Sequence, residues 1–169
     1  MQRSVLWLAL SMGFMNCAAS AGDLPDPRLT PGLADPSLTR DKLCAPGFST
    51  KTIRRHGSRA SGDEIYRAYG VTRNDPPCPC EIDHLIPLGI GGSSDRGNLW
   101  PQSYSAVPWN SKRKDELETQ LRTEVCSGKI ELLAAQHEIA TDWIAAYQKR
   151  FGQPSAKRRK ASASLLSTP

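Results

Sequence analysis

The chain has 169 residues, 38% of them hydrophobic, which is enough for one domain with its own core. Its formal net charge is +5, but five of its cations lie near the chain ends, at Arg3 and in the run KRRK at 157–160. The remainder is close to neutral, so the overall charge does not by itself indicate a nucleic-acid-binding protein.

The first 21 residues are typical of a secretory signal peptide. Arg3 precedes an apolar stretch at 5–15, and the sequence ASA at 19–21 matches an A-x-A cleavage site. The stretch is shorter than the ~20 residues of a membrane-spanning helix. We therefore expect cleavage before Gly22 and a periplasmic or secreted product that does not bind a membrane. An uncleaved anchor and a lipid-modified Cys17 are the alternatives.

The next segments are predicted to contain little regular structure. Residues 22–43 carry four prolines and no periodicity, which indicates an extended or disordered lead-in. A strand is expected between residues 44 and 55, and a short helix at 61–69, where capping residues stand at both ends. The sequence from Cys80 then predicts a strand, a glycine-rich loop and a second short strand.

The C-terminal third is predicted to be helical. Leu117, Leu121 and Val125 recur every four residues and define the buried face of one helix. A second helix is expected at 131–151, followed by a disordered basic tail at 153–169. The fold class is α+β, and the predicted parts are a signal peptide at 1–21, a lead-in at 22–43, one folded domain at 44–152 and the tail.

Four cysteines follow the signal peptide: Cys44, Cys78, Cys80 and Cys126. An even number in an exported chain indicates disulfides, and four cysteines permit three pairings. A Cys44–Cys126 bridge would tie the N-terminal segment to a helix end. A Cys78–Cys80 bridge closes a tight ring, so strain favours crossed pairings instead. A four-cysteine zinc site is the alternative, although its usual signature is two C-x2-C pairs.

Asp83 and His84 lie in the densest group of reactive side chains. A strand delivers them together, and a glycine pair, Asn98 and Asn110 follow. This combination suits metal-assisted phosphodiester hydrolysis, in which a divalent cation stabilises the developing charge while a general base deprotonates water. Histidine suits the base, and carboxylate and amide oxygens suit Mg²⁺ or Mn²⁺ better than Zn²⁺.

The sequence DHLIPLGIGGSSDRGNLWP from Asp83, followed by WNSKRKD at a helix start, resembles the HNH endonuclease family. The likeness covers about residues 80 to 126. It implies a ββα-metal motif, in which a two-stranded hairpin and a helix grip one metal ion. In this chain, additional helices and disulfides would brace that motif.

The resemblance also implies roles for individual residues. Asp83 and Asn110 would be metal ligands, His84 the general base, and Asn98 the residue that holds the loop. Lys114 lies one helical turn after Asn110, where it would meet the scissile phosphate. Twelve residues separate Asn98 from Asn110, more than in compact members of the family, so Asp95 or Asp115 is an alternative third ligand.

Other residues are interpreted with their alternatives left open. Two basic clusters could follow a phosphate backbone, the first with Lys51, Arg54, Arg55 and Arg59, the second with Lys112, Arg113 and Lys114. We favour the second, because it lies within the motif. Trp100 and Trp109 are expected in its hydrophobic floor, with base stacking as the alternative. His56 and His137 are interpreted as incidental.

The resemblance implies a metal-dependent endonuclease of low sequence specificity that hydrolyses nucleic acid, DNA rather than RNA. It would leave 5′-phosphate and 3′-hydroxyl ends. One Mg²⁺ or Mn²⁺ ion is expected, with Zn²⁺ or Ni²⁺ as alternatives, and the chain is expected to be a monomer. Two non-enzymatic hypotheses remain. One is a periplasmic protein that keeps this scaffold to bind nucleic acid or metal without cleavage, and the other is a zinc-stabilised binding module.

Overall fold

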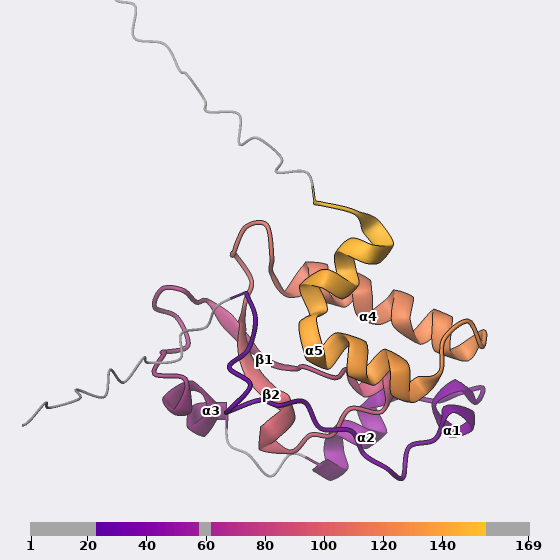
Figure 1. Cartoon of the computed structure of the whole chain (residues 1–169). Coiled ribbons are helices and arrows are strands. Elements are labelled where there is room, and N and C mark those ends of the chain that lie inside the picture. The colour runs from indigo at the N-terminus through magenta and orange to yellow at the C-terminus, as the bar shows by residue number, and fades with distance from the viewer. Residues whose placement is uncertain (1–22, 58–61, 155–169) are drawn as a thin grey trace, which may run out of the picture.

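The computed structural model describes residues 23–57 and 62–154 (Figure 1). The expected signal peptide, most of the expected tail, and Arg59 lie outside the described residues. The elements in chain order are α1 (Arg40–Cys44), α2 (Thr50–Gly57), α3 (Gly62–Ala68), β1 (Cys80–His84), the 3-10 turns η1 (Leu88–Ile90) and η2 (Arg96–Asn98), β2 (Leu99–Ser103), α4 (Ser111–Cys126) and α5 (Leu132–Phe151). Helices around a two-stranded antiparallel sheet make this an α+β fold, as predicted.

The two strands of the sheet and the loop between them match the strand, glycine-rich loop and second strand that the sequence predicted. Asp83 pairs with Trp100, and His84 pairs with Leu99. Trp100 is fully buried and Leu99 nearly so. The hairpin therefore anchors the Asp-His pair at the end of a strand whose partner belongs to the core.

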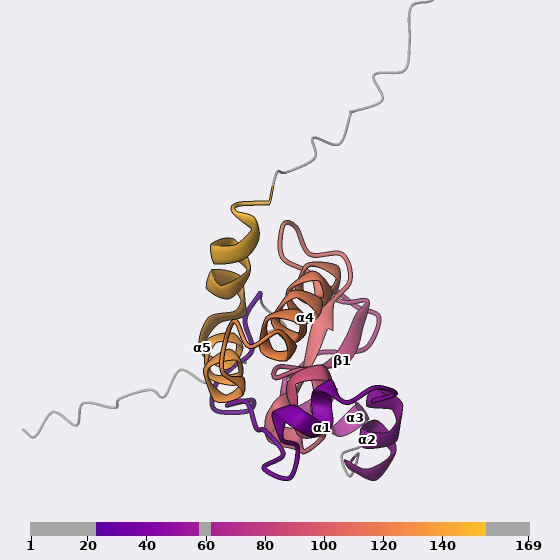
Figure 2. The same cartoon turned by 90° about the vertical axis from the view of Figure 1, so that its right-hand side faces the viewer.

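The helix α4 lies between α5 and the hairpin, as Figure 2 shows. Its first turn is capped by Asn110, whose side chain accepts the backbone N–H of Arg113. Leu117, Leu121 and Val125 form its buried face, as the four-residue spacing predicted. The helix is thereby fixed against the core from both sides.

The strand expected between residues 44 and 55 is wrong, because α1 ends at Cys44, a turn follows, and α2 begins at Thr50. Ser49 starts the helix by accepting the N–H of Lys51 at its hydroxyl and that of Thr52 at its carbonyl. The half-buried Ile53 belongs to this helix, which packs against η1. The short helix expected at 61–69 is present as α3, and those at the C-terminus are α4 and α5.

The proline-rich lead-in is extended, and it is packed along the body of the protein. The hydroxyl of the buried Thr30 lies 2.7 Å from the hydroxyl of Tyr69 and donates to the carbonyl of Leu99 at 2.9 Å. Farther toward the N-terminus, the indole N–H of Trp143 donates to the carbonyl of Asp23. These long-range bonds make the lead-in part of the folded domain, and α1 begins inside it at Arg40.

The disulfides join Cys44 to Cys126 and Cys78 to Cys80. The first ties the end of α1 to the end of α4. The expectation that strain favours crossed pairings is wrong, because the backbone before β1 brings Cys78 and Cys80 to a Cα separation of 4.5 Å, which a disulfide spans. All four sulfurs are bonded to one another, so they do not form the alternative zinc site.

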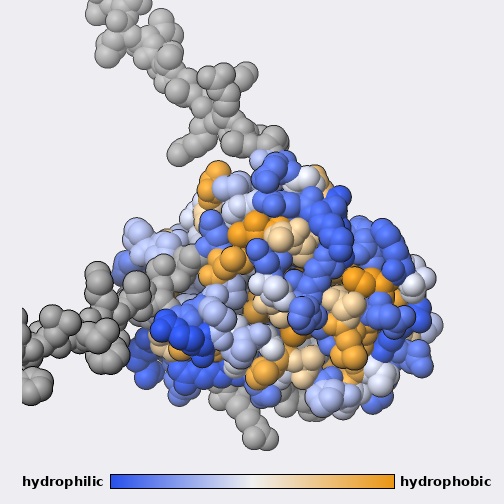
Figure 3. All heavy atoms as spheres, viewed as in Figure 1, coloured by the Kyte–Doolittle hydropathy of each residue, from blue (hydrophilic) through white to orange (hydrophobic). Residues whose placement is uncertain are grey.

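The surface carries scattered hydrophobic side chains. Figure 3 shows hydrophobic patches interrupted by hydrophilic side chains on one face. Among residues 23–57 and 62–154, no helix is both long and apolar enough to cross a membrane.

Candidate active site

The loop between the strands is held by the fully buried Asn98. Its amide oxygen accepts the N–H of Ile86 at 2.9 Å and that of Leu33 at 3.3 Å. Its amide nitrogen donates to the carbonyls of Ile86 at 2.9 Å and Ser93 at 2.7 Å. Gly92 completes the loop, because a Cβ there would lie 1.7 Å from the carbonyl oxygen of Ile86. Asn98 therefore acts on the backbone that follows His84.

His84 ends β1 as a half-buried side chain with a fixed ring. Its Nε2 lies 3.1 Å from the hydroxyl of Ser94, in the same loop. Burial lowers the pKa of His84 to about 4, since it disfavours the imidazolium form; the cations of Arg54 and Lys114 lower it further, while Asp83 opposes them. The imidazole is therefore neutral at neutral pH.

Lys114 on α4 is fully buried behind this strand. Its ammonium group lies 2.8 Å from Oδ2 of Asp83, donates to the backbone carbonyl of His84 at 2.6 Å, and forms an ion pair with Glu118. Lys114 is therefore not a solvated surface charge. Its expected contact with the scissile phosphate would require the ammonium to leave these partners.

Acidic side chains outnumber Lys114 around the strand. Burial, followed by the charge of Asp83, raises the pKa values of Glu81 and Asp115. Burial also raises the pKa of Glu118, and Asp83 adds to this, although Lys114 opposes both. The local field is therefore negative, and each of these carboxyl groups is less readily ionised than in water.

The residues predicted to hold a metal ion do not form a suitable set of ligands. Oδ2 of Asp83 is enclosed and lies against the Lys114 ammonium group. The side chain of Asn110 accepts from the N–H of Arg113 and donates to the carbonyl of Ala106 at 2.9 Å. Within the part of the chain that the structure describes, no three His, Cys, Asp or Glu side chains are grouped to bind a metal ion. Asp95 and Asp115, the alternative ligands, are both exposed.

The sequence favoured the second basic cluster for phosphate contacts, and the structure does not support that preference. Arg54 of the first cluster is exposed and close enough to His84 to lower its pKa. In the second, Lys114 is buried, and Arg113 contacts Glu116 and the hydroxyl of Tyr147. The first cluster thus contributes an exposed cation, Arg54, whose charge acts on the histidine.

The remaining candidate residues that the structure describes lie in positions that give no sign of a catalytic or binding role. Trp100 and Trp109 are buried, in agreement with a hydrophobic floor and not with base stacking. His137 is exposed on α5, a helix whose other face packs into the core, and the side chain of His56 lies outside the described part.

Two residues of the site were missed by the sequence interpretation. Glu118 follows Lys114 by four residues, so the i,i+4 rule for helical ion pairs was a usable signal. Ser94 was one polar residue in a polar loop, and its approach to His84 depends on how Asn98 folds that loop.

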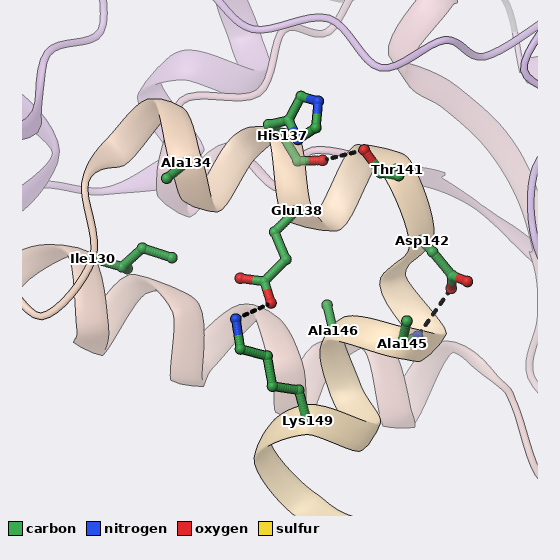
Figure 4. A pocket seen from close by; sticks show the side chains of 9 residues that line it. All are labelled: Ile130, Ala134, His137, Glu138, Thr141, Asp142, Ala145, Ala146 and Lys149. Carbon is green, nitrogen blue, oxygen red and sulfur yellow. Dashed lines mark hydrogen bonds and ion pairs between the residues drawn. The ribbon is translucent and has the colours of Figure 1, made fainter.

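A separate hollow lies on the outer face of α5, between Ile130 and Lys149 (Figure 4). Several of the polar groups drawn there have local partners: Glu138 pairs with Lys149, and the hydroxyl of Thr141 donates to the carbonyl of His137. Its lining includes neither Asp83 nor His84, and we assign it no chemistry.

Comparisons with known protein families, with curated proteins and with solved structures found no match for this chain.

Proposed function

We propose that this protein hydrolyses phosphodiester bonds of nucleic acid, DNA rather than RNA, with low sequence specificity and with His84 as the general base. The observation that carries the proposal is the state of His84. It is neutral at neutral pH, and its ring is oriented by Ser94 at the end of a strand. It also has the exposed cation Arg54 near it. A base and a cation side by side suit an anionic ester.

The order of the hairpin β1–β2 and the helix α4 supports an HNH-like ββα unit in this proposal. The two disulfides fit an oxidising compartment, in line with the periplasmic or secreted destination expected from the N-terminal sequence.

The proposed step uses His84 and water. In the tautomer whose Nε2–H donates to Ser94, Nδ1 carries the lone pair that takes the proton from the attacking water. The water oxygen bonds to phosphorus, the bond from phosphorus to the 3′ oxygen breaks, and that oxygen leaves with the bonding electron pair and takes a proton from solvent water. A bound phosphate beside His84 favours the imidazolium form, which strengthens the base while substrate is present. Because the predicted metal ligands do not assemble, no step of this proposal uses a metal ion.

The second candidate is a protein that binds nucleic acid without cutting it. The observation in its favour is the ion pair between Lys114 and Asp83, which neutralises the carboxylate that the family pattern assigns to the metal. The exposed residues Lys51 and Arg54 would then supply contacts to the phosphate backbone.

One experiment separates the candidates. The oxidised protein is incubated with supercoiled plasmid, single-stranded DNA or RNA, in Mg²⁺, Mn²⁺ or EDTA, beside His84→Ala and His137→Ala. Loss of a general base slows hydrolysis by roughly 10²- to 10⁴-fold, so His84→Ala should lose nicking at this scale while its circular dichroism stays native. His137→Ala is the matched control, since its ring is exposed on α5 and distant from this chemistry, and it should cut like wild type.

Equal cutting by His84→Ala and wild type would contradict the role of His84. Absence of cutting by wild type on every substrate, together with salt-sensitive DNA binding, would replace the proposal with the binding protein.

A further inference from the structure

The ammonium group of Lys114 is surrounded by three oxygen atoms from three residues. Oδ2 of Asp83 lies at 2.8 Å, the backbone carbonyl oxygen of His84 at 2.6 Å, and Oε1 of Glu118 completes the set. The Lys114 side chain has no exposed surface, while the carboxylates of Asp83 and Glu118 are 18% and 25% exposed. The cation is thus enclosed together with Oδ2 of Asp83, and only other parts of these two acidic side chains reach the surface.

We propose that Lys114 is the resident cation of this site and takes the place that a divalent metal ion would fill. Carboxylate and carbonyl oxygens are the ligands that hard cations use in proteins. Here the same types of oxygen surround the ammonium nitrogen of Lys114. The ammonium group donates hydrogen bonds to the carbonyl of His84 and to Glu118, and the carboxylate of Asp83 adds an ion pair at 2.8 Å.

The arrangement also excludes a second cation at the same oxygens. A divalent ion at Asp83 would lie in contact with the Lys114 ammonium, and like charges repel strongly in a partly buried site. Lys114 cannot withdraw readily, because it extends from α4 into the protein and would have to give up all three partners at once. The sequence places this lysine only one turn after Asn110, so the same helix that was expected to supply a metal ligand supplies the cation instead.

The replacement has a structural consequence for His84. The bond from Lys114 to the carbonyl of His84 fixes the backbone of the residue that carries the imidazole. Lys114 is therefore a positioning residue that holds the strand end, as a metal ion bound to the neighbouring aspartate would.

The test is a Mn²⁺ titration of the full oxidised chain, with free Mn²⁺ counted by electron paramagnetic resonance. Wild type should show no stoichiometric site at millimolar Mn²⁺, and Asp83→Asn should behave identically. Lys114→Ala removes the cation and leaves space among the oxygens, so it should bind one Mn²⁺ at least ten-fold more tightly than wild type. Its melting temperature should rise when Mn²⁺ is added.

Lys114→Met is the matched control, because it removes the same charge but fills the space, and it should not gain the Mn²⁺ site. One Mn²⁺ per wild-type chain that Asp83→Asn abolishes would overturn the proposal, and this comparison remains decisive if the lysine variants fail to fold. A folded Lys114→Ala that binds no Mn²⁺ would also overturn it, since the oxygens would then not form a cation site.

The inference does not rest on nuclease activity, because its readout is metal binding. Combined with the proposed function, it implies that EDTA leaves the wild-type cleavage rate unchanged. A chain that neither cuts DNA nor binds Mn²⁺ would contradict the proposed function alone.

Discussion

The helix α4 carries a charged cluster at each end, and the two clusters behave in opposite ways. Near its start, the site cluster consists of Lys114 with Asp83 and Glu118, where carboxylates outnumber the cation. Near its end, the brace consists of Arg150 with Glu124 and Glu138, to which Lys129 and Lys149 add further positive charge. Both clusters pair acidic with basic side chains, but the carboxylates are in excess in the site cluster and the cations are in excess in the brace.

The ratio of acidic to basic side chains sets the direction of the pKa shifts. Burial raises the pKa of Glu118, and Asp83 adds to the effect. In the brace, burial would raise the pKa of Glu124 too, but hydrogen bonds from Gln120, Arg150 and Lys129 outweigh it and lower the pKa to about 2. A cluster whose ionised forms are favoured is a structural device, whereas one that holds disfavoured charge beside a neutral histidine has the character of a functional site.

The largest effect should come from removing the centre of the brace. Arg150→Met leaves Glu124 and Glu138 without their shared partner, although their side chains are only 7% and 18% exposed. Breaking a buried ion pair in this way costs roughly 3–5 kcal/mol of unfolding free energy. Urea denaturation measures the loss. Lys149→Met is the control, because Lys149 is 68% exposed and its pair with Glu138 should contribute less than ~1 kcal/mol. Similar losses from both variants would show that the brace is not centred on Arg150.

These clusters also mark the limit of what the sequence could predict. The strands, α4 and α5 follow from periodicity and capping, which act within a few residues. The pair Lys114–Glu118 is local and could be found by spacing. The brace joins residues 26 positions apart, and the lead-in is held by a bond from Thr30 to Tyr69, 39 positions away. Such contacts depend on how the elements pack, and periodicity carries no information about that.

The candidate site shows the same division. The sequence grouped Asp83, His84, Asn98 and the start of α4, and these residues lie close together in the structure. The sequence did not reveal that Lys114 turns inward, since a lysine at a helix start is as compatible with solvent as with a buried carboxylate. The metal ion stays a prediction of the family pattern, and the packing of one side chain is what argues against it.

A smaller effect is expected from acid. The pKa of Glu124 in the folded protein is about 2, below its ordinary value of 4.5, so its contribution to stability is complete above pH 4.5 and is lost as the pH falls toward 2. The shift corresponds to about 3 kcal/mol, at ~1.36 kcal/mol per pKa unit. Glu124→Gln should therefore be less stable than wild type at pH 6 and approach it near pH 2. Unfolding free energies measured across this range test the point, and parallel pH profiles would contradict it.

The smallest effect, with the opposite sign, should appear in the site cluster. The pKa of Glu118 is raised in the folded protein, so its ionised form is disfavoured by folding, and stability is lost as the pH rises above 4.5. Glu118→Gln keeps an oxygen that accepts from Lys114 but removes the charge. It should therefore be at least as stable as wild type at pH 7, and its stability should decline less than that of wild type between pH 5 and pH 8. If Glu118→Gln instead lost as much stability as Glu124→Gln, the site cluster would be a second brace. Its excess negative charge would then no longer indicate a functional site. An ion pair that stabilises the fold would be a sufficient reason for Lys114 to be buried.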